Sequence, residues 1–167
     1  MRSRKKLGKH SMTATKRTRT AAPMGGDLRK APDGKAPSFL IRAMRDPDGA
    51  NLDRVQVVKG WLDASGETHE RIYDVAVSGG RTIGTDGRCK TPVGSTVDVA
   101  NATWTNTIGA PELIAVWKDP DFDPKELAFY YTRVIEIPTP RWTAYDAQRF
   151  NVQPVPGTMM TVTERAY

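Results

Sequence analysis

The fold is decided at residues 128–137, which read AFYYTRVIEI. Aromatic and β-branched side chains in such density favour a β-strand over a helix, and alternate side chains of a strand point to opposite faces. Phe129, Tyr131, Ile135 and Ile137 share one face, interrupted by Arg133, and Tyr130, Thr132, Val134 and Glu136 share the other. We expect one face to belong to the core and the other to be half-exposed.

Three further β-type runs precede this strand. Residues 38–44, 52–62 and 70–77 are apolar or alternate between apolar and polar side chains. The second and third runs flank a short loop that contains Gly66, which predicts a β-hairpin. Five glycines within residues 78–95 predict a long loop after the hairpin.

The remaining segments are short. The Thr- and Val-rich residues 96–105 predict another strand, whereas residues 112–117 fit either a strand or a helical turn. Residues 119–124 predict a turn, because each proline forces the residue before it out of the helical region. A short helix is expected over 143–150 and a last β-type piece over 159–163. The whole pattern predicts a mostly β protein with an antiparallel β-sandwich-like domain.

The positive charge of the chain is concentrated at its N-terminus. Residues 1–20 hold eight basic side chains and no acidic one (Arg2, Arg4, Lys5, Lys6, Lys9, Lys16, Arg17 and Arg19). The rest of the chain carries 17 basic against 19 acidic residues. So sharp a break in composition predicts a disordered basic arm over residues 1–23 and a β-rich domain over residues 24–167.

The sequence leaves two hypotheses open for the function of the arm. Its content of Arg, Ser and Thr resembles a mitochondrial presequence, although few apolar residues are available for an amphipathic face. It also suits nucleic acid, because each phosphate that a basic side chain neutralises releases counterions, but no aromatic residue stands ready to stack on a base. The arm lacks the apolar core of a signal peptide. The chain has no run long enough to cross a membrane, so we expect it to be soluble, and its localisation stays unknown.

Residues for catalysis or metal binding are few. The single cysteine, Cys89, excludes an internal disulfide framework and a cysteine-cluster zinc site, and we interpret it as an incidental loop residue. The two histidines, His10 and His69, are too few and too far apart for a hydrolytic metal centre. No Gly-x-Ser-x-Gly or phosphate-binding glycine loop occurs. The sequence therefore predicts no catalytic residue, metal ligand or cofactor in this chain.

The spacing of Asp119, Asp121 and Asp123 resembles the start of a calcium-binding loop. An EF-hand would need glycine at the sixth position and glutamate at the twelfth, where Pro124 and Tyr130 stand. We therefore interpret these aspartates as turn-forming residues.

The segment after the strongest strand is the best candidate for a specific contact. Pro138 and Pro140 stiffen it, and Arg141, Trp142 and Tyr145 follow. Arginine beside tryptophan suits anion binding, a cation–π contact or a domain interface. The alternative is a strand end that is capped by a packed tryptophan.

Six runs of sequence, taken together, resemble a known family. They are residues 24–28 (MGGDL), 45–53 (RDPDGANLD), 57–61 (VVKGW), 106–109 (NTIG), 119–124 (DPDFDP) and 137–145 (IPTPRWTAY). From about Met24 to Tyr167 the chain is similar to the C-terminal region of the domain-of-unknown-function family 3604. Members of that family resemble large, often exported proteins. In them, a hydrolase domain similar to the polymerase-and-histidinol-phosphatase class precedes a β-rich region.

The resemblance implies that the parent protein is a metal-dependent hydrolase, with its divalent metal in an N-terminal domain. Phosphoesterase is the activity that the resemblance suggests. The family's Gly-Asp-x-His-x-His type of ligand motif does not occur in this chain, so no catalytic residue carries over. Residues 1–23 depart from the family sequence, and relatives continue beyond the position of Tyr167 with a strand ending in a Ser-Pro-Ile-Trp type of sequence.

These departures lead us to expect a truncated product without independent activity. We expect it to be a non-catalytic accessory β domain whose partner is the missing hydrolase-like domain, or a second copy bound through exposed strands. The rival hypothesis is a small binding protein that uses its basic arm on nucleic acid.

Overall fold

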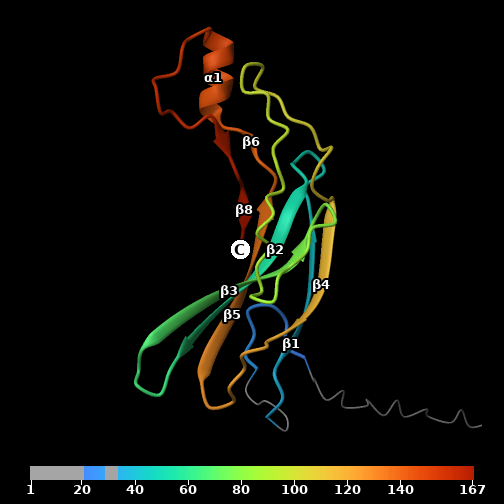
Figure 1. Ribbon diagram of the computed structural model, residues 1–167, viewed down its shortest axis with the longest axis vertical. Helices are drawn as coiled ribbons and strands as arrows, with labels where there is room; N and C mark the ends of the chain where they lie inside the picture. The colour runs from blue at the N-terminus through green and yellow to red at the C-terminus, as the bar shows by residue number, and fades with distance from the viewer. Residues whose placement is uncertain (1–20, 29–33) are drawn as a thin grey trace, which may run out of the picture.

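The computed structural model describes residues 21–28 and 34–167 (Figure 1). The expected basic arm over residues 1–23 lies outside the described residues except for Ala21, Ala22 and Pro23. Its disorder and its nucleic-acid role therefore stay predictions.

The described residues form short strands and one helix, as the sequence predicts. In chain order they are β1 (Ser38–Met44), β2 (Leu52–Leu62), β3 (Thr68–Val77), β4 (Glu112–Lys118), β5 (Leu127–Glu136), β6 (Thr139–Pro140), α1 (Trp142–Phe150), β7 (Thr161–Val162) and β8 (Arg165–Ala166). The mostly β fold is confirmed, and residues 112–117, which the sequence left open, belong to a strand.

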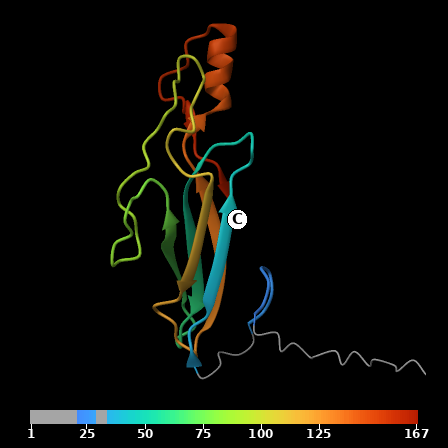
Figure 2. The same ribbon diagram turned by 90° about the vertical axis from the view of Figure 1, so that its right-hand side faces the viewer.

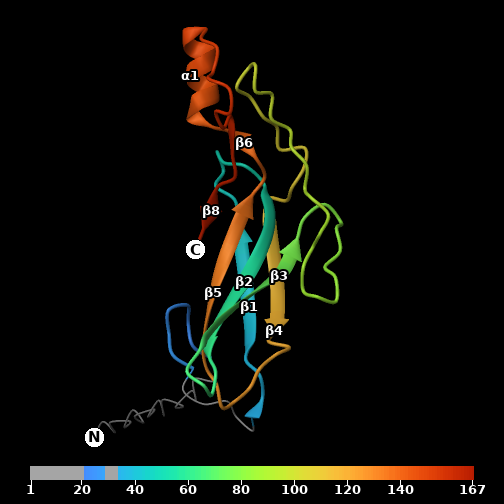
Figure 3. The ribbon, with the colours of Figure 1, turned by 60° about the vertical axis from the view of Figure 1, so that its left-hand side comes forward.

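The strands pair into antiparallel sheets. The larger sheet has the order β3-β2-β5-β8, while β1 pairs with β4, and β6 pairs with β7. In Figure 3 the strands of the larger sheet cross over β1, and β4 contacts both β3 and β2. The β1–β4 sheet therefore forms a second layer against one face of the larger sheet, which gives the sandwich-like arrangement.

The predicted hairpin is formed by β2 and β3. Leu62 pairs with Thr68, and the five-residue connection between them turns at Gly66, whose φ is +85°. The Asp63 carboxylate accepts hydrogen bonds from the Ser65 hydroxyl and from the backbone N–H groups of Ser65 and Glu67. The Ser65 hydroxyl and then the His69 ring hold the pKa of Asp63 well below its usual range. A carboxylate that organises the turn explains why this loop is so short.

The segment at residues 96–105 does not form the predicted strand. It holds a single bridge, between Asp98 and Thr103. The Asp98 carboxylate accepts hydrogen bonds from the N–H groups of Ala100 and Asn101, and Ala102 has a positive φ of 50°. An aspartate that bonds to the following backbone groups favours a turn over a strand, and this local effect outweighs the β propensity of the threonines and valines.

The faces of β5 are divided between core and solvent. Tyr130 packs between the two layers, where its ring meets Phe39 and Trp117. Phe129 and Tyr131, which point the other way, are both exposed. The side of β5 that carries these two aromatic rings therefore faces solvent, whereas Ile137, just after the strand, is fully buried.

A buried ion pair lies between the layers. The Nζ of Lys59 is 2.8 Å from Oδ2 of Asp119, and the two side chains are 2% and 0% exposed. Lys59 also donates to the Asp121 carbonyl at 2.7 Å, and the Tyr130 hydroxyl donates to the same Asp119 oxygen at 2.6 Å. Burial, and then the hydrogen bond to Asp119, raises the pKa of Tyr130, so its hydroxyl remains a proton donor. Each charge is thus paired and hydrogen-bonded, as burial requires.

The neighbouring Asp121 extends this network to the surface. Its carboxylate accepts hydrogen bonds from the Tyr73 hydroxyl and from Arg71, and its N–H donates to Asp119. Asp123 accepts the N–H of Lys125 within the turn. The interpretation of these aspartates as turn residues is correct but incomplete, since Asp119 also joins the turn after β4 to the centre of β2.

We predict that Lys59→Met lowers the free energy of unfolding by about 3–5 kcal/mol, because Asp119 is left as an uncompensated buried charge. The double variant Lys59→Met/Asp119→Asn should recover part of the loss. Urea denaturation measures both changes. Arg71→Met is the control, since Arg71 and Asp121 form an exposed pair whose removal costs about 1 kcal/mol or less. Equal losses for Lys59→Met and Arg71→Met would contradict the prediction.

Candidate functional site

The predicted contact residues lie on a projection at one end of the molecule. The projection consists of the β6–β7 pair and α1, and Figure 1 places α1 at the tip. Arg141 is the N-cap of α1 and has an extended backbone, with φ −80° and ψ 161°. Its N–H donates to the Met160 carbonyl at 2.9 Å, which fixes the helix start to the returning chain. The helix ends at Asn151, which adopts the left-handed conformation that asparagine tolerates.

The structure brings Arg141 and Trp142 together. The guanidinium carbon of Arg141 lies 5.9 Å from the centre of the Trp142 ring, within the range of a cation–π contact. Tyr145 follows one helical turn later, so it shares a face of α1 with Trp142. Trp142 is 63% exposed and Tyr145 42%. The alternative of a packed tryptophan is therefore wrong, and Ala144 is the residue of α1 that is buried.

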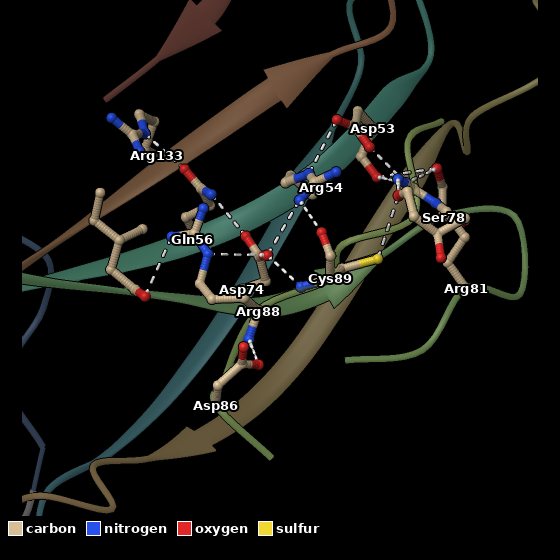
Figure 4. Close-up of polar contacts among 12 residues, drawn as sticks. Asp53, Arg54, Gln56, Asp74, Ser78, Arg81, Asp86, Arg88, Cys89 and Arg133 are labelled. Atoms are coloured by element: carbon tan, nitrogen blue, oxygen red, sulfur yellow. Dashed lines mark hydrogen bonds and ion pairs between the residues drawn. The ribbon is translucent and has the colours of Figure 1, made fainter. Parts of the chain in front are cut away.

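A second polar cluster joins the segment after β3 to the larger sheet (Figure 4). At its centre is Asp74, whose side chain is fully buried. Its carboxylate accepts hydrogen bonds from Gln56 at 2.6 Å, from Arg54 at 3.1 Å and from the N–H of Cys89 at 2.7 Å. Arg133 in turn donates to Gln56 at 2.8 Å. Directed hydrogen bonds therefore hold the long loop against the larger sheet.

Arg81 secures the start of the same loop. Its guanidinium donates to the Asp53 carboxylate at 2.5 Å and to the carbonyls of Ser78 and Thr91. Cys89 is buried beside this cluster, and its thiol donates to the Thr91 carbonyl. The interpretation of Cys89 as a loop residue is correct, and its place is structural.

Neither polar cluster is predicted from the sequence. A signal was present: Gln56 and Lys59 interrupt the apolar residues 55–62 of β2, and Asp74 interrupts the apolar residues 72–77 of β3. Such residues are buried only when partners satisfy them. The partners come from residues far apart in the sequence, so they could not be assigned without the fold.

The carboxylates and histidines of the described part of the chain do not gather into a metal site. No group of three or more His, Cys, Asp or Glu side chains in residues 21–28 and 34–167 is arranged to hold a metal ion. His69 lies 2.7 Å from Asp63 in the hairpin turn and its ring is stacked on Trp61. The described part also has no helix with the length and hydropathy needed to cross a membrane.

The fold and these surfaces define a β-rich domain with two buried polar clusters and an exposed aromatic projection. Residues 3–167 match the family described as "Protein of unknown function (DUF3604)", and the chain belongs to that family. The matched region begins at residue 3, so the expectation that the residues before Met24 depart from the family sequence is wrong for residues 3–23. No curated protein and no solved structure matches the chain.

We predict that the Cys89 thiol of the native protein reacts slowly with a thiol reagent, because the segment around it must open first. Asp74→Ala removes charged hydrogen bonds worth about 1.5–3 kcal/mol each. It should therefore speed labelling roughly tenfold or more under conditions where circular dichroism shows folded protein. Asp98→Ala, in the turn over residues 98–101, is the control. Equal labelling rates in the two variants would contradict the role of Asp74.

Proposed function

We propose that this chain is a non-catalytic accessory β domain that binds the metal-dependent hydrolase-like domain of its family. The observation that carries the proposal is the exposed face of α1, where Arg141, Trp142 and Tyr145 lie together. Tryptophan, tyrosine and arginine are the side chains that contribute most at protein interfaces. The order of domains in the family, as the sequence resemblance implies it, supplies the partner.

The proposed absence of catalysis rests on how the carboxylates are used. Asp119 is paired with Lys59 and accepts from Tyr130, and Asp121 accepts from Arg71 and Tyr73. Oxygen atoms already bonded to lysine, arginine and tyrosine do not fit a divalent metal, which needs free carboxylate or imidazole ligands. We therefore assign the divalent metal of the family to the hydrolase-like domain, and derive no chemical step in this chain.

The α1 face suits a protein partner better than a free anion. Both nearby cations already lie over aromatic rings, Arg141 over Trp142 and Arg149 over Phe150, and Tyr145 adds a further aromatic surface. An interface centred on aromatic side chains, with arginine at its side, has the composition typical of domain contacts.

We expect the full chain to bind a separately produced hydrolase-like domain of the same family, and Trp142→Ala to weaken that binding about thirtyfold, which corresponds to about 2 kcal/mol for a central interface residue. Calorimetry measures the affinity. Phe129→Ala is the matched control, because Phe129 is also an exposed aromatic residue but lies on the larger sheet, away from α1. Equal losses in the two variants, or no binding by the unmodified chain, would refute the proposed interface.

A separate prediction concerns chemistry. The purified chain should show no phosphatase or phosphodiesterase turnover with added manganese or zinc, because it lacks the set of ligands that lowers the pKa of a bound water. Turnover of a chromogenic phosphate ester is the measurement. Metal-dependent hydrolysis that co-purifies with the chain through repeated chromatography, and is altered by a substitution in it, would overturn the non-catalytic assignment.

A further inference from the structure

Within the described part of the chain, nothing covers the outer face of the β1–β4 sheet, which carries an apolar patch. The inward side chains of this sheet, such as Phe39 and Trp117, meet the larger sheet. The outward positions hold four aliphatic side chains that are 58–77% exposed: Leu40, Met44, Ile114 and Val116. Such a patch on two short strands favours association with another surface.

The outward row of β4 is complementary in charge to itself. Read along the strand, every second residue gives Glu112, Ile114, Val116 and Lys118. The sequence of this row is acidic, aliphatic, aliphatic, basic. When a second copy of the row runs antiparallel to the first, Glu112 meets Lys118 at both ends, and Ile114 meets Val116 twice in the middle. A pattern of this kind fits a two-fold interface, in which the same patch serves both partners.

The outward residues of β1 fit the same arrangement. Ile41 and Ala115 are register partners at the middle of the two strands. A two-fold axis that lies between the two sheets, perpendicular to the strands at this level, places each strand against its own copy. Leu40 then lies against the aliphatic stem of Arg42 from the partner, a contact that arginine side chains commonly make. Glu112 already forms an ion pair with Arg42 of its own chain, whereas Lys118 forms no ion pair with any described residue.

We propose that two copies of this chain pack face to face through the outer surfaces of their β1–β4 sheets, with the strands antiparallel and Glu112 of each copy paired with Lys118 of the other. Sheets that pack in this way keep their strand directions within about 30° of each other, so the end-to-end pairing of the two rows is retained. The interface lies on a different face from α1, and it does not depend on the proposed binding of a hydrolase-like domain.

The test uses two single charge reversals of the full chain, Glu112→Lys and Lys118→Glu, studied by sedimentation equilibrium over a concentration series. The unmodified chain should dimerise. Each variant alone should dimerise at least tenfold more weakly, since like charges then meet at both ends. An equimolar mixture of the two variants should recover dimers, because one copy carries two lysines and the other two glutamates. The double variant Glu112→Lys/Lys118→Glu should also dimerise.

Lys125→Glu is the matched control, because it makes the same charge change on an exposed residue between β4 and β5 and should leave dimerisation unaltered. Val116→Lys, at the centre of the face, should abolish the dimer even if Glu112→Lys proves poorly folded, and circular dichroism checks the fold of each variant. A chain that stays monomeric at all concentrations would overturn the proposal. So would a mixture that associates no better than its two components, or single variants that dimerise like the unmodified chain.

Discussion

The buried contact between Lys59 and Asp119 joins the two layers of this protein. Lys59 lies in the middle of β2, at the centre of the larger sheet, and Asp119 follows β4 directly. Separating the layers would leave a charged group without a partner in a nearly anhydrous environment, which is costly. The pair therefore fixes how far β4 lies along β2. The ring cluster of Phe39, Trp117, Tyr73 and Tyr130 packs around this connection.

The opposite face of β2 also binds a buried carboxylate, and there the contact holds the long loop. There Gln56 and Arg54 bind Asp74 of β3, and that carboxylate holds the N–H of Cys89. A loop as long as residues 79–95 has few apolar side chains to bury, so hydrogen bonds to a buried carboxylate replace a hydrophobic anchor. Each face of β2 therefore holds another part of the fold in place: one face contacts the second layer, and the other binds the loop (Figures 3 and 4).

Many apolar side chains of the described residues lie outside the core. They form distinct surfaces: the outer face of β1–β4, the aromatic side of β5 and the face of α1, which Figure 2 shows extending beyond the sheets. Exposed aliphatic and aromatic patches of this kind mark interaction sites more often than they mark simple surface. On the α1 face arginine lies over a tryptophan ring, whereas the β4 row has opposite charges at its two ends. The two surfaces are therefore suited to different partners.

Local patterns in the sequence determined strands β1, β2, β3 and β5, the β2–β3 hairpin, the long glycine-rich loop, the short helix and the grouping of Arg141 with Trp142. Each of these depends on side chains that are near one another in the chain. Tertiary structure alone decided which face of β5 is buried, since alternation defines two faces but not which one meets β1–β4. It also decided that Asp119 pairs with Lys59 and that Asp74 holds Cys89. The energy of a buried charge depends on partners that folding brings together, and those partners lie 60 and 15 positions apart in the sequence.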